Sequence, residues 1–510
     1  MLLSLLMLIP LVGSIVVFSL PRGKDTLAKQ VAIAFALLTL AVALYLTVGM
    51  DNTNGGLQFM EKHDWIPAFG ISWTLGVDGI SVVLIAMTTI LVPLGMIAGW
   101  WDAEDAGRGT VKGYFALILA LEVFMIGVFV ANDLFLFYVF FEAMLLPVYF
   151  LIGRFGGPQR AYAAMKFLLY SLVGGLFMLA SLIGLYVVSG RELGKGTFDF
   201  EALTALNIDP ATQKMLFLGF FFAFAVKAPM VPFHTWLPDA AAEATPGTST
   251  LLVGVLDKVG TFGMLHFLLP IFPEASKYYT PVIIALAVIS IFYGALLAIG
   301  QTDLMRLIAF TSISHFGFIV LGIFAMTTQG ISGSAFYMVN HGFSTGALFL
   351  VAGFLVSRRG SKRITDFGGV NKVAPIMTGV FLMAGLSSLA LPGMSSFISE
   401  FLVLAGTFSV YQTAAVFATF GIVLAAIYIL WLYQRMMTGV PSDEVTATIK
   451  EINHRELVAV VPILAIIIAL GFLPQVALNI INPAVAQIQT YVGVSDPTSE
   501  VPISMQGDGS

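Results

Sequence analysis

The chain consists mainly of long apolar runs separated by short polar connections. A helix that crosses the hydrocarbon core of a bilayer needs roughly 20 apolar residues, and we find about fourteen runs of that kind. They occupy residues 2–20, 28–49, 76–100, 113–131, 133–152, 163–189, 213–233, 247–269, 279–300, 303–326, 331–356, 374–406, 410–435 and 456–481. Charged residues make up only 10% of the 510 positions, too few to cover a water-facing surface. The sequence therefore predicts an all-α integral membrane protein.

The basic residues of the connections predict the orientation of these spans. Lys and Arg accumulate on the cytoplasmic side of a membrane, and most of the 24 basic residues lie in odd-numbered connections. Both termini are therefore expected on the outer side. No basic residue precedes the first run, which favours a first span over a cleaved signal peptide. We expect the polar tail after Pro483 to be loosely ordered. The even-numbered connections hold only Lys62, Arg191, Lys195, Lys214 and Lys277.

Composition excludes several functions. The chain has no cysteine, which excludes thiolate-held iron–sulfur clusters and cysteine nucleophiles. The net charge of -5 gives no sign of nucleic-acid binding. We find neither a dinucleotide-binding glycine turn nor a phosphate-binding loop, and the connections are too short for a soluble catalytic domain. We expect lipid to surround most of the protein.

Two spans separated by five positions begin alike. Residues 132–135 (Asn-Asp-Leu-Phe) open the fifth run, and residues 302–305 (Thr-Asp-Leu-Met) open the tenth. An odd offset inserts the two copies in opposite directions, which is typical of inverted repeats in transporters. The alternative is that helices in general often begin with a capping Asp.

Two further runs with the same offset carry helix-breaking residues. Pro229 and Pro232 lie in the seventh run, and Pro392 and Gly393 lie in the twelfth. Discontinuous helices at matching places in two halves point to a transport site. We therefore expect two inverted five-helix repeats, each with a broken helix. The expected parts of the chain are three N-terminal spans (1–112), the two repeats (113–278 and 279–437), and a last helix with a polar tail (438–510).

Ionisable residues inside the runs are the strongest functional candidates. A charge at the centre of a bilayer costs roughly 2.5–3.5 kcal/mol on insertion scales, so such residues are functional candidates by default. His234 and His266 lie nearer to span ends and receive lower weight. The mid-span candidates are Glu122, Glu142, Lys227, Asp257, Lys258, His315, His341 and Glu400.

Glu142 and Lys227 are expected to act together. Glu142 stands in an aromatic segment in which Tyr138 is the only other ionisable group, and Lys227 follows the Phe- and Ala-rich residues 220–226. A lysine whose proton affinity depends on the distance to a carboxylate can be switched by moving that carboxylate. The alternatives are an ion pair that only fixes helix packing, and a lysine that extends to the membrane surface.

The other buried groups are candidates for a proton relay. Lys258 stands in mid-span beside Asp257, as a relay or as the static partner of an acid. His315 and His341 lie in mid-span on consecutive helices, and a neutral imidazole can donate a proton at one nitrogen while it accepts at the other. Hydrogen-bonded structural histidines are the alternative. The histidines and carboxylates lack metal-ligand spacing.

The chain contains three long motifs, at residues 132–153, 227–240 and 302–315. They resemble the antiporter-like membrane subunits of respiratory complex I, the bacterial NADH:quinone oxidoreductase. The resemblance covers most of the chain. One place departs from the family, because Ala241 stands where a histidine is usual, and this leaves the proton access of that loop open. The twelfth helix carries Glu400, whereas sister subunits and related sodium/proton antiporter subunits carry a lysine there.

The resemblance implies a fold and a set of roles. The fold would have fourteen helices, with helices four to eight and nine to thirteen as inverted repeats. Glu142 and Lys227 would be a coupled pair, and Lys258 the central relay. Glu400 would be the terminal acid of the second half-channel, with His315 and His341 between it and Lys258.

The resemblance also implies partners and a location. The chain would translocate protons without redox chemistry of its own and would hold no cofactor, since NADH, FMN, iron–sulfur clusters and quinone would belong to partner subunits. Those partners would be other membrane subunits of complex I, including two sister antiporter-like subunits. The location would be the inner (plasma) membrane of a bacterium.

Three alternatives remain. The first is a subunit of a multi-subunit cation/proton antiporter, against which Glu400 argues. The second is the equivalent subunit of a membrane-bound hydrogenase. The third is a scaffold subunit without transport, which leaves the buried charges unexplained.

Overall fold

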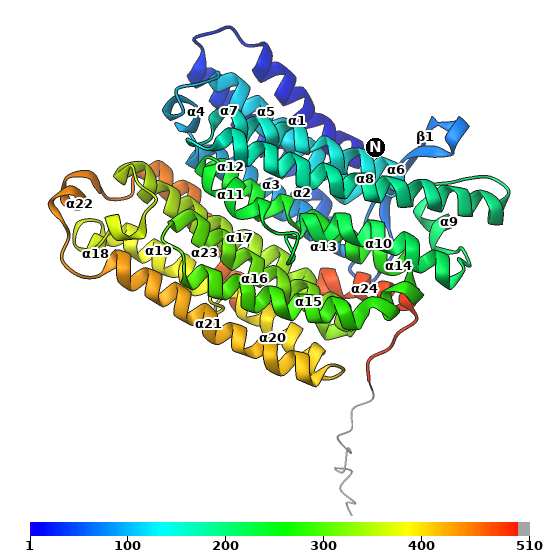
Figure 1. Cartoon of the computed structure of the whole chain (residues 1–510). Coiled ribbons are helices and arrows are strands. Elements are labelled where there is room, and N and C mark those ends of the chain that lie inside the picture. The colour runs from blue at the N-terminus through cyan, green and yellow to red at the C-terminus, as the bar shows by residue number, and fades with distance from the viewer. Residues whose placement is uncertain (498–510) are drawn as a thin grey trace, which may run out of the picture.

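The computed structural model describes residues 1–497. It is a bundle of long helices with one two-stranded hairpin (Figure 1). In the described part, twelve helical segments are long and apolar enough to cross a membrane. They are α1 (Leu2–Ser19), α2 (Asp25–Val48), α3 (Gly79–Ala98), α5 (Val111–Val130), α6 (Leu134–Ala143) with α7 (Leu145–Phe155), α8 (Arg160–Leu193), the segment Pro246–Ile271, α15 (Pro273–Ile299), α16 (Leu304–Ala325), α17 (Thr328–Arg359), α21 (Gln412–Met437) and α23 (His454–Phe472).

Helix breaks occur at the end of the seventh predicted span and inside the twelfth. The first division separates α10 (Pro210–Lys227) from α11 (Trp236–Glu243), and the second separates α19 (Pro375–Ser388) from α20 (Ser395–Phe408). The structure confirms the prediction of an all-α membrane protein and the prediction of two broken helices. The count of fourteen, the inverted relation of the halves and the four-part division of the chain stay predictions.

Side chains from neighbouring helices satisfy the backbone groups that the breaks set free. The Trp236 indole N–H donates to the Val226 carbonyl at 2.8 Å, and the Val231 N–H donates to the Ser290 hydroxyl at 3.0 Å. At the second break, the Asn340 side-chain amide donates to the Ser395 carbonyl at 3.0 Å and to the Ser399 hydroxyl at 2.6 Å, and so holds the start of α20 against α17. Irregular backbone at membrane depth is tolerated only where protein or water satisfies it in this way.

The segment Pro246–Ile271 lies at the centre of the bundle, and its most apolar stretch is completely buried, as is that of α16. Two π-helical stretches interrupt its α-helical hydrogen bonding, and such stretches are frequent at functional sites. Asp257 and Lys258 lie between them. The parts in chain order are α12 (Pro246–Leu251), η2 (Leu252–Leu256), α13 (Lys258–Gly263), η3 (Met264–Leu268) and α14 (Leu269–Ile271).

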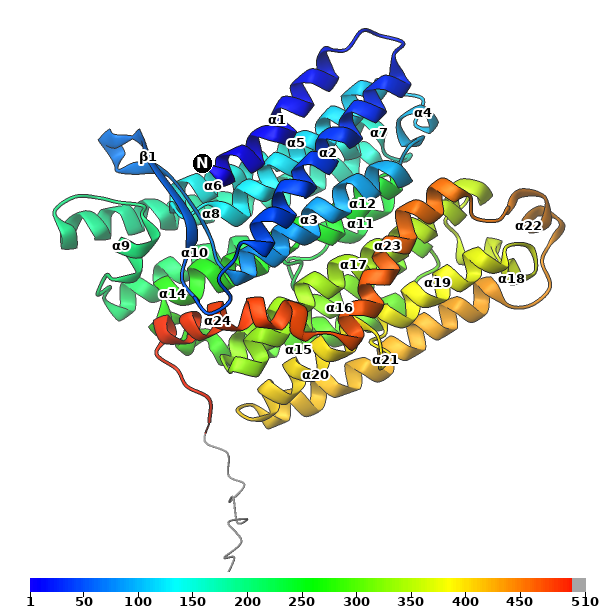
Figure 2. The same cartoon turned by 180° about the vertical axis from the view of Figure 1, so that it is seen from behind.

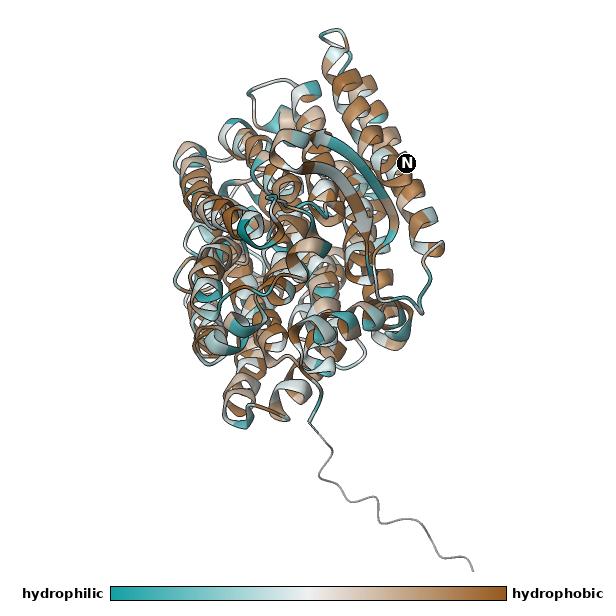
Figure 3. Cartoon of the chain, turned by 90° about the vertical axis from the view of Figure 1, so that its right-hand side faces the viewer, coloured by the Kyte–Doolittle hydropathy of each residue, from teal (hydrophilic) through white to brown (hydrophobic). Residues whose placement is uncertain are grey.

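The connection between the second and third spans forms a hairpin that the sequence analysis did not predict. Strands β1 (Gln58–Ile66) and β2 (Ile71–Val77) are antiparallel, and the turn η1 (Pro67–Phe69) ends at Gly70 with a φ of 66°. Figure 3 shows that one of the strands is mostly hydrophilic. The Met1 amino group contacts Glu61 of β1 at 2.8 Å, so the hairpin lies beside the N-terminus.

A last helix, α24 (Gln475–Val492), follows the final apolar span and lies across the bundle (Figure 2). It packs on α3, α14 and α17 through one apolar face. The expectation of a loosely ordered tail after Pro483 is therefore wrong as far as Val492, because apolar side chains at helical spacing bury this segment. Of the rest of the predicted tail, residues 493–497 form no helix, and residues 498–510 lie outside the described residues.

The loop that leads into the hairpin touches α24, since the backbone at Gly55 lies against the Pro483 carbonyl. The N-terminus and α24 therefore lie at the same end of the bundle. The short connecting helices are α4 (Asp102–Asp105), α9 (Phe200–Thr204), η4 (Ile364–Asp366), α18 (Val370–Val373) and α22 (Asp443–Thr448).

Candidate functional site

The structure brings Lys258 into contact with two of the predicted residues. Its Nζ lies 2.9 Å from Asp257 Oδ1 and 2.7 Å from His341 Nδ1. It also donates to the Val253 carbonyl, within the first π-helical stretch. The three side chains are fully buried. An ammonium group held between a carboxylate and an imidazole has an acceptor for its proton on each side.

His341 connects this cluster to His315 on the neighbouring helix. The two rings are nearly perpendicular, and their centres lie 5.2 Å apart. Among the described residues, His341 Nε2 and His315 Nδ1 have no hydrogen-bond partner. Buried polar atoms are normally satisfied by a hydrogen bond, so these two nitrogens are the unsatisfied polar atoms of this part of the row.

Two tyrosines extend the row from His315 to Glu400. The Tyr428 hydroxyl lies 3.3 Å from His315 Nε2, and the Tyr337 ring lies 5.9 Å from the His315 ring. The Tyr337 hydroxyl donates to Glu400 Oε1. Glu400 is 2% exposed, and its other carboxylate oxygen has no partner in the described chain. Buried ionisable groups therefore lie at short separations from Asp257 to Glu400, with no hydrogen bond between His341 and His315 in the described residues.

The tyrosines are the members of this row that the sequence analysis missed. Tyr337 stands four residues before His341 on α17, and that spacing places both side chains on one helix face. This signal was available in the sequence. Tyr428 lies on α21, 113 residues from His315, and no local pattern connects the two.

Glu142 and Lys227 lie in the first half of the chain, at the ends of α6 and α10. Lys227 is fully buried, and its Nζ lies 5.0 Å from the centre of the Phe141 ring and 5.5 Å from that of Phe167. Within residues 1–497, neither Lys227 Nζ nor Glu142 Oε1 has a hydrogen-bond partner. The structure therefore does not bring this pair into contact, and the ammonium group lies among aromatic rings instead.

A glycine on α8 makes room for the Glu142 carboxylate. A Cβ atom at Gly175 would lie 1.7 Å from Glu142 Oε1. Any other residue at this position would therefore displace the carboxylate. Like Tyr337 and Tyr428, Gly175 was not singled out by the sequence analysis, because its effect depends on the packing of α6 against α8.

Glu122 is buried on α5 with both carboxylate oxygens unpartnered in the described part of the protein. Two contacts set the register of α5 against the central segment. The Tyr114 hydroxyl lies 2.9 Å from the Thr245 hydroxyl, 131 residues later, and Asn132 lies 2.9 Å from His266, 134 residues later. This register places Glu122 level with η2, within about one turn of Lys258. In the described part of the chain, no hydrogen bond or ion pair joins Glu122 to Lys258 or to the other groups of the row.

The two lower-weight histidines have different surroundings. His234 lies in the first helix break, 3% exposed, with its ring centre 4.8 Å from that of Tyr293. His266 contacts Asp78 at 3.2 Å and Asn132 at 2.9 Å, and it therefore ties the starts of α3 and α6 to the central segment. In residues 1–497, no group of three His, Asp or Glu side chains has a geometry that could hold a metal ion.

The fold and this row of side chains define the class of protein. It is a membrane protein with many spans, two broken helices and ionisable groups buried inside the helix bundle. Residues 131–425 match the family model described as NADH:quinone oxidoreductase/Mrp antiporter, TM. The chain belongs to this family.

Individual relatives agree with this assignment over almost the whole chain. NADH-quinone oxidoreductase subunit M of Mycobacterium tuberculosis is 52% identical and aligns with 98% of this chain and 96% of its own length. A chain of respiratory complex I from Thermus thermophilus with bound NADH is 29% identical, with a TM-score of 0.88 over 97% of this chain and 100% of that one. The resemblance drawn from the three sequence motifs is confirmed.

The same fold occurs outside complex I. A chain of the Mrp complex from Dietzia sp. DQ12-45-1b has a TM-score of 0.84, covering 96% of this chain and 98% of that one, at 22% identity. The fold alone therefore does not separate a complex I subunit from a subunit of a Mrp complex, and the individual residues have to be considered.

Proposed function

We propose that this chain is a proton-translocating, antiporter-like membrane subunit of NADH:quinone oxidoreductase. The observation that carries the proposal is the buried row from Asp257 through Lys258, His341 and His315 to Glu400. Each charge in a membrane interior is expensive, and a scaffold would not need several of them in one row. The similarity to subunit M chains supports the choice of assembly.

The row can pass a proton by short steps. A proton that leaves Lys258 Nζ has an acceptor in His341 Nδ1 at 2.7 Å. The same ring can release a proton from Nε2 toward His315, because an imidazole carries a proton on either nitrogen. From His315 the tyrosine hydroxyls lead to the Glu400 carboxylate. Glu122 is proposed as an additional acid beside Lys258.

Glu142 and Lys227 are proposed as the switch of the first half. The aromatic surroundings of Lys227 hold the ammonium group weakly, whereas a nearby carboxylate would hold it strongly. Movement of the Glu142 carboxylate toward or away from Lys227 would therefore change how firmly the lysine keeps its proton.

The proposal assigns no redox step to this chain. NADH, FMN, iron–sulfur clusters and quinone would be held by partner subunits, among them other membrane subunits and two sister antiporter-like subunits. The proposed location is the inner (plasma) membrane of a bacterium, with both termini on the outer side.

The test uses the assembled oxidoreductase in vesicles, with Lys258→Ala on this chain. NADH-driven proton uptake should fall while the assembled complex is recovered in normal amount. Unchanged uptake would contradict the proposal. An antiporter would instead show cation-driven proton movement without NADH, so the same vesicles are also given a sodium gradient.

A further inference from the structure

A groove with a volume of about 730 Å³ opens between α1, α5 and α7, away from the buried row. One end of the groove is apolar and includes Ile15, Leu117 and Phe150. The other end carries three basic side chains, Arg22, Lys112 and Arg154, together with hydroxyl groups of neighbouring residues. The volume lies within the range of about 300–1,000 Å³ that is usual for ligand pockets.

The three basic residues come from three different elements. Arg22 follows the end of α1, Lys112 stands in the first turn of α5, and Arg154 lies in the last turn of α7. They therefore converge at one end of the bundle, where the basic residues of the connections predict the cytoplasmic surface. Only the packing of these helices brings them to one groove.

These cations have no acidic partner. Within residues 1–497, none of the three forms an ion pair with a carboxylate at 4.0 Å or less, and no Asp or Glu lines the groove. Lys112 donates one hydrogen bond, to the Leu20 carbonyl at 2.6 Å. Others of the same connections, such as Arg108 and Arg160, also lack an ion pair in residues 1–497, so it is the convergence of three such cations on one groove that distinguishes this place. Six basic residues of these connections are paired: Lys29 with Glu104, Lys166 with Asp239, Arg306 with Asp239, Arg358 with Glu456, Arg359 with Glu444, and Lys362 with Glu243.

We propose that this groove binds one anionic glycerophospholipid, with its phosphate at the three basic side chains and its acyl chains along the apolar end. Arginine holds phosphate oxygens in a planar, two-pronged geometry, and lysine adds a compact charge. Basic pockets between membrane helices on the cytoplasmic side are suited to anionic headgroups. A zwitterionic headgroup would bring its own cation to a place that already has three.

The site is independent of the proposed proton row, because none of its basic residues belongs to that row. Its role would be to hold α1 against α5 and α7 at one membrane surface. Loss of the lipid should therefore weaken this contact without changing the chemistry of the buried groups.

The test uses the full-length chain purified in detergent and stripped of lipid. Phosphatidylglycerol and phosphatidylcholine with identical acyl chains are titrated separately, and bound lipid is measured by native mass spectrometry. The parent should show one tight phosphatidylglycerol site. The variant Arg22→Gln/Lys112→Gln/Arg154→Gln should bind phosphatidylglycerol at least tenfold more weakly, with phosphatidylcholine binding unchanged.

A matched control removes three exposed basic residues elsewhere on the same predicted side, as Arg363→Gln/Lys372→Gln/Lys450→Gln. It should retain the tight site. Arg22→Lys/Lys112→Arg/Arg154→Lys keeps the charges and should also retain it, which separates loss of binding from loss of folding. Equal weakening in the control, or unchanged binding in the glutamine variant, would overturn the proposal. Displacement of the lipid by millimolar inorganic phosphate would overturn the choice of a lipid as ligand.

Discussion

Lys258 and His341 are joined by a 2.7 Å contact between Nζ and Nδ1, although 83 residues separate them in the chain. This contact connects the central π-helical segment to α17, and hence the first half of the protein to the second. It gives the lysine a partner of a kind that can take up its proton. A static ion pair with Asp257 alone would not need the imidazole.

The first prediction concerns the proton that Lys258 carries. Lys258→Arg keeps a positive charge but holds its proton at every accessible pH. We expect NADH-driven proton uptake by the assembled complex to fall at least tenfold, which corresponds to about 1.4 kcal/mol of barrier. His341→Gln should have a similar effect, because an amide does not exchange a proton in this way. Parent-level uptake with Lys258→Arg would show that the residue is a fixed charge.

The second prediction concerns Glu400 and Tyr337. Glu400→Gln keeps the shape of the side chain but cannot ionise, so proton uptake should fall, whereas Glu400→Asp should retain part of it. Tyr337→Phe removes the hydroxyl that donates to Glu400 and should reduce uptake without affecting assembly. The control is Tyr433→Phe, at a half-buried tyrosine of α21, and it should behave like the parent. Full uptake with Glu400→Gln would remove this acid from the path.

The third prediction concerns Glu142. Glu142→Gln should lower proton uptake and quinone reduction together, because the lysine loses the charged partner that controls its proton. Glu142→Asp should retain partial activity. Both rates are measured in reconstituted vesicles, with assembly checked separately. If the Gln variant assembles and keeps both rates, the residue is structural.

The fourth prediction tests the place of the Glu142 carboxylate. Gly175→Ala puts a methyl group where the carboxylate lies and should reduce the same two rates. Gly379→Ala is the control, since a Cβ at that helical glycine meets open space. In a Glu142→Ala background, Gly175→Ala should have little further effect, which a double-mutant cycle would show. Additive losses in that cycle would mean that Gly175 acts elsewhere.

The fifth prediction concerns topology. The chain has no cysteine, so single cysteines report one position each. Thr365→Cys and Glu192→Cys are exposed positions in connections of opposite predicted sides. A membrane-impermeant thiol reagent applied from outside intact cells should label Glu192→Cys only. Labelling of both from one side would contradict the predicted arrangement of spans.

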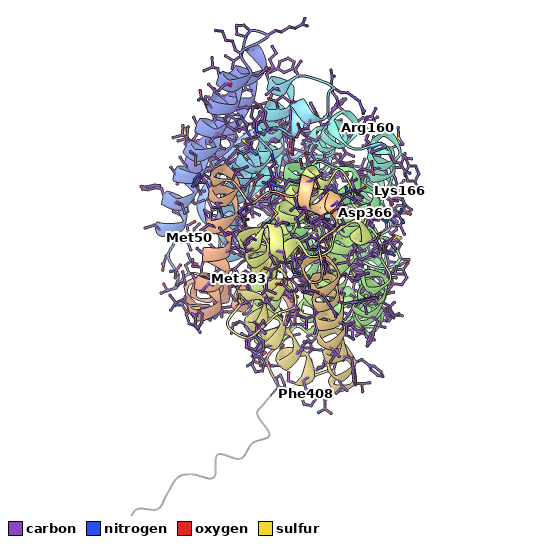
Figure 4. All side chains as sticks on the ribbon, turned by 90° about the vertical axis from the view of Figure 1, so that its left-hand side faces the viewer. Met50, Arg160, Lys166, Asp366, Met383 and Phe408 are labelled. Carbon is purple, nitrogen blue, oxygen red and sulfur yellow. The ribbon has the colours of Figure 1, made fainter. Side chains whose placement is uncertain are left out.

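Figure 4 labels Lys166 and Asp366, which belong to the predicted cytoplasmic end.

Much of the architecture followed from local patterns. Apolar runs of membrane length predicted the helices, and Pro229, Pro232 and Pro392 predicted the two breaks, because a proline lacks the N–H that a helix needs. The buried Lys258 and Glu400 stood out because charges are rare and expensive in such runs. The hairpin and α24 were not predicted, since both are stabilised by contacts with the bundle.

The sequence by itself determined that this chain is a membrane protein with ionisable groups inside its helices, since hydrophobicity and charge are properties of each residue. Only the tertiary structure decided which of these groups meet. It joined Lys258 to His341 and Tyr337 to Glu400, and it left Lys227 among aromatic rings instead of against Glu142. It also gathered Arg22, Lys112 and Arg154 at one groove. The physical reason is that such contacts depend on how distant helices pack, and helix periodicity carries no information about partners many turns away.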